Sequence, residues 1–531
     1  MNTASIYDSA LAGLQYAQAG MVATSQNVTG SNVAGYVRRN PNLQISTMSP
    51  SSLEAGGTAF SIEGFTRNFN GFLQSQLLSQ QSKTSYTATL TQTVATLNAT
   101  LVDPSASIAT ALGNFFNAAG SLANDPNSQA YQQALLGAAN LVGDRIRGLA
   151  QVVDALESNA RQGLADTLNQ ANSLAPQLAD INAKILNASV PGVSYPSGDL
   201  LDERDRITSK LQELIGGTTT INEDGTASYA FNGLQLVDRQ QFNQFTDNGS
   251  TSIRADAFPW GVKLKITTPR NSDAKYISLG NDESLQTVNG QSTLVPASPP
   301  PFTDGQAGAY FLLVQNFVPT LQKSLNVLAV QLVQRVNTTT GASALFGFDK
   351  ADGSAGSITN FAAVNIYGQP ITVTDPVSPD SMAALLNSSS LDTFNELVDA
   401  ANPASSTYLP KVKTAALAFD ARRFRAVATM PVAMSAQTAN SLESLRTQFT
   451  EPVTLITSSV ASTISTWTSN HKTNEAMSQV LADQKNAISG VNLDEEAANL
   501  VKYQQLYNAA SKLIQTNRQM FDTLLAMLSG N

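Results

Sequence analysis

The side chains that could carry out chemistry are few in this chain, and its histidine is isolated. His471 is the only histidine among 531 residues, and it lies in the polar stretch WTSNHKTNE, residues 467–475. A catalytic triad needs a histidine beside a nucleophile, and a metal centre needs several ligands at fixed spacing. Because the neighbours of His471 are polar and offer neither arrangement, we expect a solvated surface residue.

Paired carboxylates are the second candidate, since two acids at a set separation can cleave a glycosidic bond. Asp494, Glu495 and Glu496 are consecutive near the C-terminus. Consecutive residues of a helix point in different directions, so these three do not face a common substrate. Their place in the first turn of a predicted helix compensates the helix dipole. We therefore expect no catalysis from them.

A mixed cluster and two glycine-containing segments complete the candidates. Asp202, Glu203 and Asp205 alternate with arginines, which predicts ion pairs on an exposed helix in preference to a metal site. The segment NEDG at 222–225 has carboxylates without the spacing of a calcium loop, and it indicates a hairpin turn. The two adjacent glycines, Gly216 and Gly217, lack the spacing of a phosphate-binding loop. We thus predict no catalytic, cofactor or metal site.

The composition excludes further classes of site and partner. There is no cysteine, which removes disulfides, thiolate metal sites and a cysteine nucleophile. The net charge is -9 and no run of Lys or Arg marks a phosphate-binding face, so we expect no nucleic-acid partner. No apolar run approaches the ~20 residues of a membrane span, and MNTASIYDSALAGLQ is unlike a cleavable signal peptide. Trp260 and Trp467 are expected to be core or interface anchors.

A long helix with a wide apolar stripe is predicted at the C-terminus. No Pro or Gly occurs from 492 to 529, which predicts one helix of about 36 residues, roughly 54 Å long. Apolar residues recur there every seven places in three adjacent rows, the pattern of a helix that pairs with other helices. The rows are Leu493, Leu500, Tyr507, Ile514, Phe521 and Leu528; Leu506, Leu513, Met520 and Met527; and Tyr503, Ala510 and Leu524, with Asn517 interrupting the third.

A matching helix is predicted near the N-terminus, from about residue 4 to 27. Its stripe has the same spacing and consists of Tyr7, Leu14, Met21 and Val28, widened by Leu11, Ala10 and Ala17. The two terminal helices could pair only with each other. However, their stripes are wider than one partner helix covers, and an isolated helix pair is marginal in water. We therefore expect neighbouring copies of the chain to cover them.

The two ends of the chain resemble a known family. ALAGLQYAQAGMVATSQNVTGSNVAGYVRR, residues 10–39, is similar to the N-terminal signature of bacterial flagellar rod, hook and hook-associated proteins, in which an Asn-rich turn, Gly-Tyr and basic residues follow a helix. Residues 489–528, SGVNLDEEAANLVKYQQLYNAASKLIQTNRQMFDTLLAML, look like the C-terminal signature of the same family. SGDLLDERDRI, residues 197–207, resembles a segment of its hook-associated members. A departure is NVTG at 27–30, where the family usually has Asn-Ile and a small residue.

The resemblance implies a structural subunit that joins hook to filament, is exported unfolded by the flagellar type III pathway and is not an enzyme. Its implied partners are copies of itself, hook protein, the second junction protein of the hook–filament junction, and a cytoplasmic export chaperone on the C-terminal helix. It implies no cofactor and no membrane partner. The expected subunit interface consists of Tyr7, Leu11, Leu14, Met21, Val28, Asn32, Gly35, Tyr36, Leu493, Leu500, Tyr503, Leu506, Tyr507, Leu513, Ile514, Phe521, Leu524 and Leu528.

The middle of the chain predicts a fold that is mainly α with β insertions. Helical periodicity extends from about 80 to 214, with Pro176 placed to kink it, and returns at 307–339 and 406–483. Alternating strands with turns at Asp224-Gly225 and Asn232-Gly233 predict hairpins between them. A strand at 371–375 and a short helix near 391–400 are expected in a Gly-rich segment.

The expected organisation is nested, with the N- and C-terminal helices paired as a coiled coil, a discontinuous helical bundle, and outer β-rich domains. The predicted parts are a terminal coiled-coil domain (1–40 and 485–531), a helical domain (41–215, 304–339 and 406–484), a β-rich insertion (216–303) and a small mixed insertion (340–405).

Other functions are also compatible with this sequence. A secreted adhesin or binding module with a helical stalk would use the two insertions as binding heads. Another axial protein, such as hook protein, would share the terminal helices. The acidic and basic block at 202–205 and the chain length favour the hook-associated members. An enzyme carried on the outer domains is a third alternative.

Overall fold

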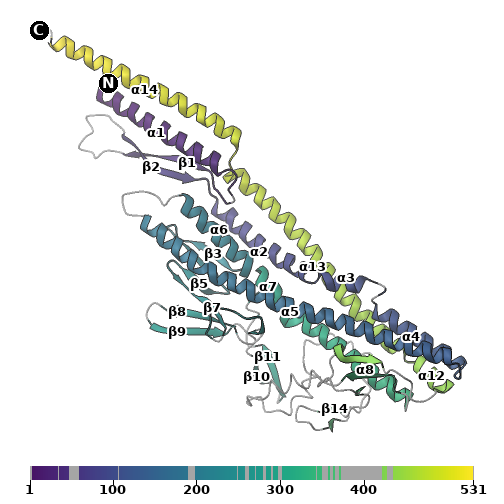
Figure 1. Cartoon of the computed structure of the whole chain (residues 1–531). Helices are drawn as coiled ribbons and strands as arrows, with labels where there is room; N and C mark the ends of the chain where they lie inside the picture. The colour runs from purple at the N-terminus through teal and green to yellow at the C-terminus, as the bar shows by residue number, and fades with distance from the viewer. Residues whose placement is uncertain are drawn as a thin grey trace.

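The structure is a computed structural model of the chain, and Figure 1 shows an elongated molecule with both chain ends on the same side. It describes residues 3–33, 35–46, 59–103, 105, 107–188, 198–247, 249–257, 262–268, 271–278, 283–288, 291–296, 302–341, 344–349, 357–358, 363–364, 370–371, 421–426 and 434–529. No helix in these segments has the length and apolarity needed to cross a membrane.

The two terminal helices lie side by side and antiparallel (Figure 1). They are α1 (Thr3–Gly30, 28 residues) and α14 (Leu493–Ser529, 37 residues), which confirms the predicted helices to within a few residues at each end. An antiparallel hairpin of β1 (Arg39–Ser46) and β2 (Ala59–Arg67) lies along α1 and was not predicted. We call these four elements the terminal unit.

The rest of the helices form an extended body beneath the terminal unit. Polar side chains cap the starts of several of them; for example, Asn70 accepts a hydrogen bond from the Leu73 amide and Ser107 accepts one from the Thr110 amide. The longest helix continues without a break through Pro176. The helices of the body are α2 (Gly71–Thr93), α3 (Ala95–Val102), α4 (Ile108–Asn124), α5 (Gln129–Ala188), α6 (Gly198–Ile215), α7 (Gly305–Leu312), the π-helical turn η4 (Leu313–Phe317), α8 (Val318–Thr340), α12 (Ala436–Glu443) and α13 (Arg446–Ser489).

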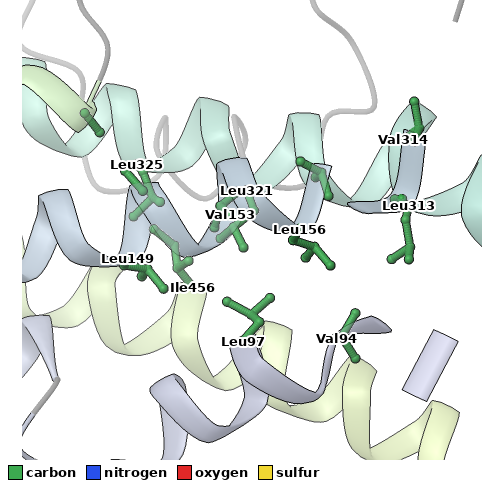
Figure 2. Packing of buried hydrophobic residues seen from close by; sticks show 14 of the residues in the cluster. Val94, Leu97, Leu149, Val153, Leu156, Leu313, Val314, Leu321, Leu325 and Ile456 are labelled. Carbon is green, nitrogen blue, oxygen red and sulfur yellow. The ribbon is translucent and has the colours of Figure 1, made fainter. Parts of the chain in front are cut away.

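One hydrophobic core connects these helices. Apolar residues of α5 at helical spacing, such as Leu149, Val153 and Leu156, face side chains from several other elements (Figure 2). Figure 2 shows Leu321 and Leu325 of α8 and Ile456 of α13 among them, so segments far apart in sequence meet there. This arrangement confirms the predicted return of the chain to a helical bundle.

The predicted β segment after α6 forms small antiparallel sheets. The turn between β4 and β5 has Asn232 at φ 47° and Gly233 at φ 75°, the left-handed pair that a tight hairpin turn requires. The predicted hairpins at both turns are therefore confirmed. The strands are β3 (Thr218–Ile221), β4 (Ala227–Phe231), β5 (Leu234–Asp238) and β6 (Gln241–Phe242) in one sheet, β7 (Gln244–Asp247), β8 (Val262–Thr268) and β9 (Asn271–Ser278) in a second, and β10 (Glu283–Val288) with β11 (Gln291–Pro296).

The prediction of helix from 406 to 483 was wrong for residues 421–426. Residues 421–423 form a 3-10 turn and β16 (Phe424–Ala426) is a strand that pairs with β12 (Phe346–Asp349), so residues 421–426 are not α-helical. Residues 406–420 and 427–433 of this segment lie outside the described residues. The physical reason is the aromatic packing of Phe424, whose ring centroid lies 5.2 Å from that of Phe346. The other described strands here are β13 (Ser357–Ile358), β14 (Ala363–Val364) and β15 (Pro370–Ile371). The predicted helix near 391–400 and most of the predicted strand at 371–375 lie outside the described residues.

Asparagine side chains of α5 hold the β-rich segment in place. The Asn172 amide donates to the Phe245 carbonyl at 2.8 Å and accepts from the Phe245 amide at 2.8 Å. Asn182 makes the same pair of bonds with the backbone of Ala227, at 2.8 and 2.9 Å. A side-chain amide thus satisfies both backbone groups of a buried strand residue, which would otherwise be costly to bury.

Candidate subunit interface

The seam between α1 and α14 is made mostly of small residues. Ala10, Ala17 and Ala23 of α1 are buried, and Tyr503 and Ala510 of α14 face them. The glycine between Ala17 and Ala23 allows close approach, because a Cβ placed on Gly20 would lie 2.3 Å from the Tyr503 ring, whereas one placed on Gly13 would make an ordinary contact of 3.7 Å with Ala510. Tyr503 and Ala510 belong to the third predicted row, so the described apolar residues of α14 that are fully buried against α1 come from that row.

The other two rows of α14 are largely uncovered in the single chain. Leu493 is 54% exposed, Phe521 55% and Met527 72%, whereas Leu506, Tyr507 and Ile514 are half-buried. A large apolar surface of this kind on a protein marks an interaction site. The other strongly exposed apolar residues of the two terminal helices and the loop after α1 are Tyr7, Leu11, Val22, Val28, Val33, Leu500, Val501, Leu513, Met520 and Leu525.

The predicted interface residues therefore fall into groups. Tyr503 is buried within the helix pair. The half-buried group is Leu14, Met21, Tyr36, Leu506, Tyr507 and Ile514. The exposed group is Tyr7, Leu11, Val28, Asn32, Gly35, Leu493, Leu500, Leu513 and Phe521. The side chains of Leu524 and Leu528 lie outside the described part of the chain. Val22, Val501 and Leu525 were missed, because they lie beside the rows that heptad spacing selects.

The base of the helix pair is held by an ion-pair cluster. Arg38 contacts Glu495 at 2.7 Å and Glu496 at 2.8 Å, and the side chain of Glu496 is only 1% exposed. The Asn27 amide donates to the same Glu496 carboxylate at 3.2 Å. The dipole interpretation of the acidic triplet is thus incomplete, because two of its members bind an arginine that lies far away in sequence.

The loop after α1 folds back on the end of the helix. The Tyr36 hydroxyl donates to Asn27 Oδ1 at 2.9 Å, and its ring fills the space over Gly30, where a Cβ would lie 2.5 Å from ring atoms. Asn27 also holds the backbone of Arg39, donating to its carbonyl at 3.0 Å and accepting from its amide at 2.9 Å. Burial raises the pKa of Tyr36 to about 12, although nearby Arg39 opposes this. The Asn, Tyr and Arg of the N-terminal signature therefore form one internal cluster.

The acidic and basic segment of α6 is not the exposed surface that the sequence predicted. Asp202 contacts Arg39 at 2.9 Å and Arg67 at 2.7 Å, and Arg67 also reaches Asp205 at 2.7 Å. Arg204 is 2% exposed and donates to the Gly225 carbonyl. Arg39 and Arg67 of the β1–β2 hairpin lie more than a hundred residues before α6 in the sequence. The pattern within one helix could therefore not reveal these contacts. Only the pair of Glu203 with Arg206, at 2.6 Å, fits the prediction.

The remaining candidates for chemistry have structural surroundings. His471 is half-buried between α13 and α2, with Nδ1 3.4 Å from the Thr87 hydroxyl, so the expectation of a fully solvated histidine was wrong. Trp467 packs on Phe317 with ring centroids 5.0 Å apart, as expected for a core residue. Trp260 lies outside the described residues. In the described segments no group of three or more His, Cys, Asp or Glu side chains is arranged to hold a metal ion.

Comparisons with known proteins show similarity to flagellar proteins along the chain. The model of the flagellar hook-associated protein FlgK helical domain matches residues 94–356, and that of the flagellar basal body rod FlgEFG protein C-terminal region matches 484–527. Flagellar hook-associated protein 1 of Salmonella typhimurium is 26% identical over 570 residues, covering 98% of this chain and 99% of that protein. The protein of the same name from Escherichia coli is 24% identical over 561 residues, with 98% and 99% covered.

Two further proteins are similar to this chain. Flagellar hook-associated protein 1 of Bacillus subtilis is 21% identical over 548 residues, covering 98% of this chain and 97% of that protein. The solved structure of the flagellar hook junction protein FlgK from Burkholderia pseudomallei is 24% identical, with a TM-score of 0.39, and covers 52% of this chain and 46% of that one. Since the family matches and the nearly full-length relatives agree from the helical body to the last helix, this chain belongs to the flagellar hook-associated protein 1 family.

Proposed function

We propose that copies of this chain assemble through the uncovered apolar rows of α1 and α14 to form the inner wall of the hook–filament junction. As a member of its family, the chain is a structural protein of the bacterial flagellum, located at the junction of hook and filament. The proposal specifies the surface through which copies of the chain contact one another. The exposure of two of the three rows of α14 is the observation that supports it.

The magnitudes favour this surface. Burying a large apolar side chain yields about 1.5–3 kcal/mol. Association costs roughly 4–15 kcal/mol in lost freedom of motion. A contact that covers Leu493, Leu513 and Phe521, together with the matching residues of a neighbouring copy, is enough to offset much of that cost. The α1–α14 seam alone gains less, because apart from Tyr503 the apolar residues that it buries fully are alanine and glycine, which bury a small area.

We further propose the partners and the organisation that follow from this role. Hook protein and the second junction protein would contact the two ends of the assembled ring, and an export chaperone would cover the apolar rows of α14 before type III export. In this role the chain carries no catalysis. The domains would be a terminal unit, to which we now add the β1–β2 hairpin, a discontinuous helical body, a β-rich insertion at 216–303 and a small mixed insertion at 340–405.

The test is a double substitution on the uncovered rows. Leu500→Asp with Leu513→Asp, both exposed in the single chain, should prevent the chain from joining isolated hooks, as seen by electron microscopy, while the helical circular dichroism of the body is kept. The matched control is Asn508→Asp with Gln515→Asp, which adds the same charge to exposed polar positions of α14. If the first variant still joins hooks as well as the control does, these rows are not the joint.

A further inference from the structure

A cavity of about 330 Å³ lies in the helical body between α2, α6 and the last turns of α13. Leu77 gives its wall an apolar part, and Gln74 and Gln81 lie about one turn before and after it on the same helix. Ser209 of α6 and Lys485 of α13 also line it. Ligand pockets start at about this volume and combine an apolar wall with a few polar groups. The cavity therefore has the size and the lining of a small binding site.

Gln74 brings an acceptor without a donor to this cavity. The residue is only 9% exposed, and its Oε1 has no hydrogen-bond partner among the residues that the structure describes. Gln81 differs, because its Oε1 accepts from the Ser209 hydroxyl at 3.2 Å. A buried oxygen without a donor is costly, so a group from outside that donates to Gln74 is favoured. The ligand of this cavity should carry an N–H or O–H.

Lys485 brings a positive charge without a direct partner. It makes no ion pair or hydrogen bond with the described residues. Burial lowers its pKa, and Asp205 opposes this from a longer range. The aspartates nearby are already bound by an equal number of arginines. These residues are Asp199, Asp202 and Asp205, with Arg39, Arg67 and Arg204.

The other cations at the wall are also neutralised. Arg206 contacts Glu203 at 2.6 Å, and Lys210 contacts Glu213 at 3.0 Å. Lys485 is therefore the excess positive charge around the cavity, as far as the described residues show. Because a charge withdrawn from water favours a partner of opposite sign, the ligand should be an anion as well as a donor.

An acidic residue within a peptide has both properties, since its carboxylate and its backbone N–H lie within one residue of each other. We propose that this cavity binds an acidic residue of a second polypeptide, with its carboxylate on the Lys485 ammonium and its backbone N–H on Gln74 Oε1. The charge-assisted bond is the stronger of the two, and the neutral bond distinguishes a peptide from a simple anion. The described lining contains no residue of α14, so this site and the assembly surface fail in different experiments.

Lysine labelling of the full-length chain in dilute solution tests the site. An acetylating reagent reacts with neutral amines, and mass spectrometry of peptides gives the rate at Lys485 relative to that at exposed Lys472 of the same helix. Capped aspartate, N-acetylaspartate N-methylamide, should slow the acetylation of Lys485 roughly threefold or more, because a rise of about half a unit in its pKa lowers the neutral amine by that factor. Capped asparagine lacks the charge and acetate lacks the N–H, so both should slow it much less.

Gln74→Leu separates the two contacts. It removes the acceptor, keeps a side chain of similar size, and should reduce the effect of capped aspartate to that of acetate. Gln76→Leu, at an exposed position of the same helix, is the matched control and should behave as the parent does. If Gln74→Leu loses helical circular dichroism, the comparison of the three probes on the parent decides. An unchanged rate with capped aspartate would overturn the proposal. Equal slowing by acetate would also overturn it, because the cavity would then hold an adventitious ion only.

Discussion

Tyr503 of α14 occupies the space that Gly20 of α1 leaves open. A Cβ placed on Gly20 would lie 2.3 Å from Cε1 of the Tyr503 ring, closer than any real contact of this kind. Tyr16 packs against the same ring edge to face, with centroids 5.8 Å apart and an interplanar angle of 79°. The large and small residues of the two helices therefore set the register in which they pair.

Gly20→Ala should loosen the helix pair despite the better helix propensity of alanine. The added methyl displaces the Tyr503 ring, and overpacking of this kind costs about 1–3 kcal/mol. Faster amide hydrogen exchange across 500–510 is the expected result. Gly148→Ala of α5 is the control, since a Cβ there meets nothing within 4 Å. Equal protection of 500–510 in Gly20→Ala and the parent would show that the contact does not determine the pairing.

The pH dependence of the pair follows from the same tyrosine. Burial raises the pKa of Tyr503 from 10.0 to about 12. A group with a raised pKa in the folded state contributes stability that is complete below its unfolded pKa and is lost as the pH rises through the folded one. The pair should therefore weaken between about pH 10 and 12. Titration of phenolate absorbance in the parent and in Tyr503→Phe gives the pKa by difference. A value near 10 for the folded chain would contradict the buried position.

The Asn172 clamp should contribute strongly to the stability of the body. Asn172→Leu leaves the Phe245 amide and carbonyl buried without their partner, and each unsatisfied group costs about 1–3 kcal/mol. We expect a loss of about 2–5 kcal/mol in the free energy of unfolding, measured by urea denaturation. Gln177→Leu, at an exposed position whose amide bonds only to the Ser173 carbonyl of its own helix, is the control. A loss no larger than that of the control would mean that the strand does not depend on α5.

Local patterns in the sequence predicted the helices and turns that interactions between neighbouring residues determine. Heptad rows gave α1 and α14, and Asn232-Gly233 gave a hairpin, because helix faces and tight turns are determined by neighbouring residues. The contact of Arg39 with Asp202 joins residues 163 apart, and no periodicity predicts it. For the same reason the sequence pattern predicts an exposed helix at α6 and a helix at 424–426, where the structure has buried ion pairs and a strand. Which heptad row faces α1 also depended on a distant residue, Gly20.

In the free chain, the terminal helices should be far less protected from exchange than the body. The seam between α1 and α14 buries mainly alanine and glycine, and a buried methyl or methylene group contributes only about 0.8 kcal/mol. We expect the pair to open often and to become protected on assembly, when neighbouring copies cover the exposed rows. Hydrogen exchange across 500–524, measured on dilute monomer and on assembled protein, checks this.

The body provides the internal standard for that measurement. Residues 142–168 of α5 lie in the hydrophobic core, where Val142, Ile146 and Val153 are fully buried, so their amides should exchange only on global unfolding. If 500–524 in the monomer exchange as slowly as this segment, the two helices are stable alone. The exposed rows would then be unnecessary for order at the ends of the chain, and the strongest physical reason for an intermolecular surface there would be lost.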